Sequence, residues 1–234
     1  MSAAVPAPDT PVASIAEAIA RMEAIEASLP AADGFACFNR MYLDVTRQVN
    51  SQLSQGFFAE PAFWAQLDVE FANLFFAAVD AAADPAAVPL AWRPLAERRA
   101  GPGIEPIQFA LAGMNAHINH DLPLALASTC AALATAPDVG SHLADYRKVD
   151  QLLDAAEQSI RQSFESAPEL AVDRHLSAVA DLVGNWTINS ARDLAWNNCL
   201  LLWAVREDPV VRGLFLDTLA ASTALAAQLL LVAV

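Results

Sequence analysis

The chain has 234 residues, of which 56% are apolar and 17% charged, so it can bury the core of one large domain. Its formal charge is −14 and its few Lys and Arg residues form no stripe, which argues against nucleic acid and anionic membranes as partners. Alanine and leucine dominate the apolar content and β-branched runs with strict alternation are few. The sequence therefore predicts an all-α fold, a single-domain bundle of about eight helices.

The two ends and the cysteines suggest a compartment. Residues 1–11 are rich in Ala and Pro and are predicted to be a mobile tail, so the helical domain spans residues 12–234. The N-terminal stretch has neither the basic region nor the apolar run of a secretory signal. Cys37, Cys130 and Cys199 are widely spaced in apolar contexts, which is typical of reduced, buried thiols. The expected location is cytoplasmic.

Apolar periodicity and proline or glycine breaks divide the chain into helices. The segment 84–104, which is rich in Pro and Arg, is interpreted as a connection, with a lid over a site as the alternative. The uncharged stretch 218–234 is interpreted as a buried helix, with a membrane anchor as the alternative. Helices are expected over residues 11–29, 36–55, 61–83, 91–99, 106–135, 141–166, 168–184, 185–205 and from 209 onward.

The third expected helix carries an acidic residue where an apolar one belongs. Asp68 falls in the same sector of the helix as Trp64, Phe71 and Phe75. A lone ionised carboxylate among aromatic rings would be costly. Asp68 therefore needs a partner or a raised pKa.

The stretch from Asn115 to Pro123 concentrates polar residues within an otherwise apolar helix. His120 and Asp121 follow His117 by three and four residues, so the three side chains project from one helical face. Pro123 has no N–H to donate, and its ring is expected to kink the helix. The sequence thus predicts a site on this helix.

A third polar insertion lies in the helix expected over residues 185–205. Asn189, Asp193 and Asn197 recur every four residues between tryptophans. They form a polar ladder on a helix whose other sides are apolar, so this helix is expected to be buried nearly all round.

The simplest way to satisfy three such insertions is for them to meet inside the bundle, where helical proteins place their sites. We therefore expect an acid–base centre made of His117, His120 and Asp121 and supported by Asp68 and Asp193. The alternative is a hydrogen-bond network that only fixes helix register. The expected substrate-binding residues are Asn115, Asn119, Asn189, Asn197, Trp64, Phe71, Phe75, Trp186 and Trp196.

A divalent metal such as zinc is one option for this site. His117 and Asp121 would supply two ligands from one helix, and further ligands would have to come from Asp68, Asp44, His120 or Asp193. Glu-x-x-His pairs are absent, which disfavours a di-iron bundle. In the metal-free option, His117 or His120 acts as general base or acid, oriented by an aspartate.

Three functional hypotheses follow. The first is a small-molecule enzyme that hydrolyses an ester or phosphoester, with or without a metal. The second is a cofactor-free cyclase or isomerase in which an acid–base pair moves protons inside an aromatic-walled pocket. The third is a non-catalytic binding or scaffold protein with a structural polar core. Glycine-rich phosphate loops are absent, so nucleotide cofactors are not expected.

The sequence Asn-Ala-His-Ile-Asn-His-Asp-Leu-Pro-Leu-Ala-Leu, residues 115–126, resembles a bacterial family of unknown function. The same resemblance includes Met-Tyr-Leu-Asp-Val-Thr at residues 41–46 and Arg-Asp-x-Ala-Trp at residues 192–196. It covers nearly the whole chain after the tail. It marks positions, and it implies no reaction.

A second likeness is confined to one fragment. Helical zinc phospholipase C and P1-type nucleases carry a His-x-x-x-Asp sequence on a helix, shortly followed by proline, and the segment from His117 to Asp121 is similar to it. No second His-x-x-x-Glu and no further downstream histidine complete the pattern here. The likeness therefore implies one metal at most.

Overall fold

The computed structural model describes the backbone of residues 10–165 and 187–233, and the side chains of residues 10–153 and 187–233. Within these residues the chain forms helices and no strand, which confirms the predicted all-α fold. The predicted helix over 168–184 and most of the predicted tail lie outside the described residues. The elements are α1 (Ile15–Ser28), α2 (Gly34–Ser54), α3 (Pro61–Asp80), the 3₁₀ turn η1 (Ala81–Ala83), α4 (Arg93–Arg98), α5 (Pro106–Ala116), the π-helical turn η2 (His117–Asp121), α6 (Leu122–Ala132), α7 (His142–Glu165), α9 (Ile188–Ala204) and α10 (Pro209–Leu230).

Several helices begin at residues whose side chains cap the free backbone N–H groups of the first turn. Ser14, Asp33, Thr187 and Asp208 each accept a hydrogen bond from a backbone N–H two or three residues ahead. Prolines occupy the first turns of α3, α5 and α10, where no N–H is needed. These signals explain why the predicted helix starts agree with the observed ones to within a few residues.

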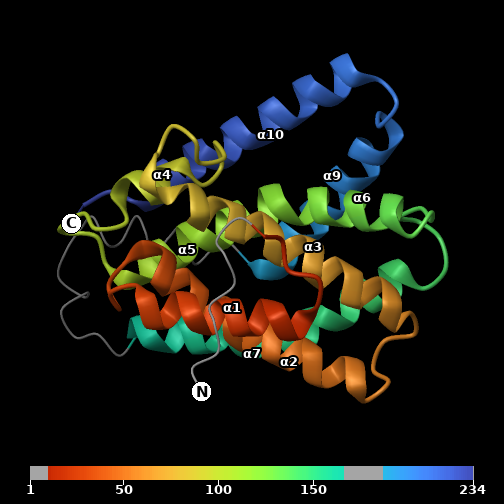
Figure 1. Ribbon diagram of the computed structural model, residues 1–234, viewed down its shortest axis with the longest axis horizontal. Helices are drawn as coiled ribbons and strands as arrows, with labels where there is room; N and C mark the ends of the chain where they lie inside the picture. The colour runs from red at the N-terminus through yellow and green to blue at the C-terminus, as the bar shows by residue number, and fades with distance from the viewer. Residues whose placement is uncertain (1–9, 166–186, 234) are drawn as a thin grey trace.

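The segment made of α5, η2 and α6 runs through the middle of the molecule (Figure 1). Helix α2 packs against α5 and α1, whereas α3 and α9 pack against α6, and α7 packs against α2 and α9. Buried side chains gather in two clusters, one around Phe75 and Trp92 and the other around Trp64 and Trp196. Phe71 and Ile118 pack against both clusters. The centre of the bundle is therefore where the two clusters meet.

The middle of the segment 84–104 packs into the core. Val88, Trp92 and Leu95 are almost completely buried. Arg93 donates to the backbone carbonyls of Ala86 and Val88, so this cation holds the segment's own turn. The interpretation as a connection agrees with this packing.

The expectation that the stretch 218–234 is a buried helix is wrong, because α10 is buried over only part of its length. Its second half is fixed to the bundle: Asn115 donates to the carbonyl of Thr223, and Gln108 donates to that of Leu230. In its most apolar 18-residue window, by contrast, only 28% of the window is buried. By length and composition alone, α10 could cross a membrane. Helix α10 lies along one edge of the molecule (Figure 1), and its exposed apolar side chains include Val210, Leu214, Leu225 and Leu229.

Candidate functional site

The polar stretch of the central helix is a π-helical turn. Leu122 donates its backbone N–H to the carbonyl of His117, five residues back. Pro123 follows in the first turn of α6 and cannot donate to the carbonyl of Asn119. The wider turn accommodates the proline, so the structure has a π bulge where the sequence predicted a kink. Single π turns inside α-helices are frequent at functional sites.

Asp121 is the centre of a buried hydrogen-bond cluster. Its Oδ2 accepts from Trp92 Nε1 at 2.8 Å and lies 3.2 Å from His117 Nδ1. Its Oδ1 lies 2.7 Å from His120 Nδ1. Asp121 is 2% exposed, so three N–H donors compensate a negative charge that would otherwise be very unfavourable inside the protein.

The pKa shifts define the protonation states of this cluster. Burial raises the pKa of Asp121, but hydrogen bonds from His117 and His120 outweigh burial, so the pKa of Asp121 lies below its ordinary value. Burial lowers the pKa of His117, and Asp121 only partly offsets that effect. At neutral pH the pair is therefore a carboxylate and a neutral imidazole. Because Nδ1–H donates to Asp121, the lone pair of His117 lies on Nε2.

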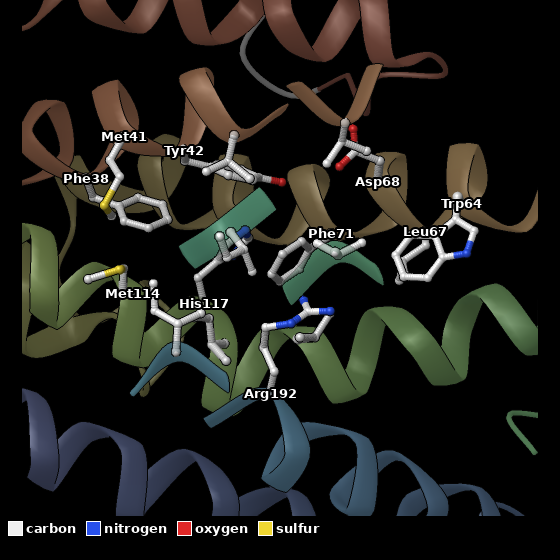
Figure 2. A pocket seen from close by; sticks show the side chains of 17 residues that line it. Phe38, Met41, Tyr42, Trp64, Leu67, Asp68, Phe71, Met114, His117 and Arg192 are labelled. Atoms are coloured by element: carbon white, nitrogen blue, oxygen red, sulfur yellow. The ribbon is translucent and has the colours of Figure 1, made fainter. Parts of the chain in front are cut away.

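His117 lines a cavity of about 90 Å³ at the centre of the bundle (Figure 2). Its Nε2 atom is buried and has no hydrogen-bond partner. The ring of Phe71 stacks on the imidazole with centroids 3.5 Å apart, and the ring of Tyr42 meets it edge-on at 4.4 Å. These contacts hold the imidazole in place while leaving Nε2 unpaired. The full lining is Phe38, Met41, Tyr42, Val45, Val49, Trp64, Leu67, Asp68, Phe71, Met114, His117, Ile118, Leu122, Val149, Leu153, Ile188 and Arg192.

Asp68 lines the same cavity from α3. Figure 2 shows its side chain on the side of the cavity formed by α2 and α3, with His117 on the opposite side. Its Oδ2 atom is buried without a hydrogen-bond partner, and burial raises the pKa of Asp68 to about 7. A substantial fraction of Asp68 is therefore a neutral carboxylic acid at neutral pH.

Two further polar side chains border the cavity. Tyr42 extends from α2 toward Asp68 (Figure 2), and burial together with the charge of Asp68 raises the pKa of its phenol. Arg192 belongs to α9 and donates to two partners on α7, the carboxylate of Asp150 and the backbone carbonyl of Tyr146. Its guanidinium reaches the cavity from the side opposite Tyr42 (Figure 2).

The prediction that the polar ladder reaches the centre of the bundle is wrong for two of its members. Asp193 and Asn197 are exposed on α9, because the buried side of that helix is formed by residues such as Ala195, Trp196 and Cys199. Asn189 is half-buried and does not line the cavity. The ladder therefore contributes no acid to the centre.

The other predicted binding residues divide between the cavity and its surroundings. Trp64 and Phe71 line the cavity. Phe75 is completely buried beside His117, with ring centroids 6.2 Å apart, and Trp196 packs on Tyr146 in the neighbouring cluster.

The two predicted amides form a structural link. Asn119 donates to the Asn115 side chain, and Asn115 ties the turn to α10. Their hydrogen bonds are therefore directed away from the cavity. Trp186 lies outside the described residues.

The donor geometry does not support the predicted metal. Over residues 10–153 and 187–233, whose side chains are described, no group of three or more His, Cys, Asp or Glu residues is arranged to hold a metal ion. His117 and Asp121 direct Nδ1 and Oδ2 at each other. Asp44 is exposed, and its nearest cation is Arg47 at 3.7 Å. The predicted ligand pair is thus a hydrogen-bonded pair.

Sequence reasoning missed Trp92, Tyr42 and Arg192 as members of the site. Trp92 lies in the segment between α3 and α5, and its only signal was that a buried indole N–H needs an acceptor. Tyr42 lies in the stretch 41–46 of the resemblance, which carries no role for it. Arg192 was noted only within the resemblance. Their roles depend on which helices become neighbours.

Comparison with known proteins places the chain in a family without assigning an activity. No curated protein and no solved structure matches it. A model of a protein family matches residues 15–233, almost all of the helical domain, and this match confirms the predicted family resemblance. The likeness to helical zinc phospholipase C is not tested by it. The chain belongs to the family of unknown function DUF5995.

Proposed function

We propose that this protein is a cofactor-free enzyme that isomerises a small, largely apolar carbonyl compound by moving a proton within the central cavity. One observation carries the proposal. His117 Nε2 and Asp68 Oδ2 are both buried, both lack a hydrogen-bond partner and belong to side chains that line the same cavity. Each unpaired polar atom costs about 1 to 3 kcal/mol. A network that served only helix register would have paired them.

The protonation states suit a base and an acid. Neutral His117 takes a proton from a carbon next to the substrate carbonyl, and Asp121 stabilises the resulting imidazolium through Nδ1. The neutral Asp68 carboxyl gives its proton to the carbonyl oxygen, which produces an enol. The imidazolium then returns its proton to a different carbon while the enol hydroxyl returns a proton to Asp68. In a substrate with a carbon–carbon double bond beside these carbons, that double bond has moved. Both His117 and Asp68 have regained their starting protonation states.

The cavity favours this chemistry over hydrolysis. Among the described residues that line it, no Ser, Thr or Cys offers a nucleophile, and most of the wall is aliphatic or aromatic. A water needs about 10 to 15 Å³ of such space, so a cavity of about 90 Å³ suits a substrate of only a few non-hydrogen atoms. Small β,γ-unsaturated ketones have this size and this chemistry, and small cyclic ketones share its first step, the transfer of a proton from the carbon next to the carbonyl.

Deuterium exchange tests the proposal without knowledge of the natural substrate. The protein is incubated in D₂O with cyclopentanone or a small β,γ-unsaturated ketone, and label at the carbons next to the carbonyl is followed by NMR. We expect exchange above the buffer rate. His117→Gln should lower that protein-catalysed rate by about 10² to 10⁴-fold, the usual contribution of a general base. Asp193→Asn, at an exposed carboxylate of α9, is the matched control and should exchange at the wild-type rate.

The pH profile provides the second readout. The rate should decline above about pH 7 because Asp68 loses its proton there, and Asp68→Asn should abolish this alkaline decline while lowering the rate. On the acid side, the rate should fall only below the lowered pKa of His117. If folded wild-type protein exchanges no faster than buffer, or if His117→Gln exchanges as fast as wild type, the proposal fails.

A further inference from the structure

Helix α10 carries an apolar seam on its solvent face. Its positions alternate by three and four residues, the spacing of helices that pair with another helix. Every seam residue is exposed. None of them carries a charge, although the chain as a whole is strongly acidic. The opposite face of α10 packs on α5 and α4. The seam consists of Val211, Leu214, Thr218, Ala221, Leu225 and Gln228.

We propose that this seam is a homodimer interface, in which α10 packs antiparallel against α10 of a second copy. The order of the residues is self-complementary. When the two helices run in opposite directions with the two-fold axis between Thr218 and Ala221, Leu214 of each copy faces Leu225 of the other. The same register places Thr218 opposite Ala221, so small side chains lie at the centre and the helices can approach closely. A two-fold interface requires this kind of self-matching surface.

Charge supports a second copy as the occupant. The charged residues of α10 are Arg212 and Asp217. In the proposed register Asp217 faces Ser222 of the other copy, so no like charges meet. The apolar side chains at both ends are among the most exposed in the described part of the chain: Val210 is 70% exposed, Leu214 64%, Leu225 60% and Leu229 57%. Val210 faces Leu229 in this register.

A lipid bilayer fits the same surface less well. Helices that lie on membranes usually carry many Lys and Arg residues on their polar face, whereas α10 has one Arg. Crossing a bilayer would pull α10 away from α5. The buried side chains of Asn115 and Gln108 would then lose the backbone carbonyls to which they donate.

The size of the seam sets the expected affinity between the two copies. A standard interface involves about 20 to 30 residues on each side, and a helix of 22 residues offers fewer than that on one face. We therefore expect a dimer that dissociates in the micromolar range. Sedimentation velocity on the full chain at about 1 to about 100 µM should show a mass rising toward twice 24.9 kDa.

Introducing a charge into the seam tests the interface. Leu214→Glu should weaken dimerisation at least about tenfold, and because Leu214 is exposed the variant should keep its fold by circular dichroism. Leu194→Glu is the matched control, since Leu194 is 53% exposed on α9 and outside the seam. A wild-type chain that stays monomeric over this range, or a dimer that Leu214→Glu leaves intact, overturns the proposal.

Cysteine pairing tests the register. An equimolar mixture of Leu214→Cys and Leu225→Cys should form a disulfide-linked heterodimer under mild oxidation, while each variant alone should not. The native Cys37, Cys130 and Cys199 are buried and will not interfere. Homodimers of each single variant would indicate parallel pairing and would refute the antiparallel register. A monomer that binds phosphatidylcholine vesicles through Leu214 would assign the seam to lipid and also refute the proposal.

Discussion

Asp68 should destabilise the folded protein at neutral pH, and Asp68→Asn should therefore make it more stable. Burial raises the pKa of Asp68 from 3.8 to about 7. A carboxyl with a higher pKa in the folded chain than in the unfolded chain binds its proton more readily when folded. Folding stability consequently decreases as pH rises between these two values, and it levels off above the higher one.

The size of the effect follows from the shift. Each pKa unit corresponds to about 1.4 kcal/mol, so a rise of about three units costs about 4 kcal/mol above pH 7 and almost nothing below pH 4. Asparagine has nearly the shape of the neutral carboxyl and cannot ionise. Asp68→Asn should therefore gain up to about 4 kcal/mol at pH 8, less the cost of pairing its amide imperfectly, and should show no gain at pH 4.

Urea unfolding of wild type and Asp68→Asn at several pH values measures this difference directly, because ionisations shared by both proteins cancel. Asp193→Asn, with its exposed carboxylate, should show no comparable pH-dependent gain. If Asp68→Asn is less stable than wild type at pH 8, or if the difference does not change with pH, Asp68 is paired in solution and the reasoning about the cavity is wrong.

Two other substitutions test the surroundings of the site. Trp92→Phe removes the indole donor to Asp121 and should cost about 1 to 3 kcal/mol of unfolding free energy in urea titrations; a change within about 0.5 kcal/mol would contradict the role of Trp92. At Gly113, an added Cβ would lie 2.5 Å from the Phe38 ring, so Gly113→Ala should destabilise the protein by about 1 to 3 kcal/mol. Gly213→Ala is its control: nothing lies within 4 Å of that Cβ, and alanine should stabilise α10 by up to about 1 kcal/mol. Equal melting temperatures for the two alanine variants would refute the packing at Gly113.

The parts of the site that the sequence predicted are those in which local pattern and burial agree. Asp68 was recognisable because it replaces an apolar residue on an aromatic face, and its buried position with a raised pKa follows from that placement. His117 and Asp121 were recognisable because their spacing places them on one turn. The hydrogen bond between Nδ1 and Oδ2 has the geometry that the spacing allows.

The errors arise where several helical neighbours decide the outcome. Asp193 and Asn197 sit between tryptophans, and the sequence alone could not show that the buried arc of α9 runs through Ala195 and Cys199 instead. The indole of Trp92 reaches Asp121 from a segment 29 positions earlier in the chain, and no periodicity encodes such a contact. The exposed face of α10 was mistaken for core because composition does not reveal how much of a helix finds a partner.

The extra residue in the central π turn constrains how this protein can change. Each residue of an ordinary α-helix accounts for about 100° of rotation, whereas the wider π turn takes up one residue without adding that rotation. Removing one residue from this turn would therefore restore an α-helix and leave the side of α6 that packs against α9 in place. Removing one residue within α6 itself would turn the rest of that helix by about 100°, so single deletions should be confined to the π turn among relatives that keep the same helix neighbours.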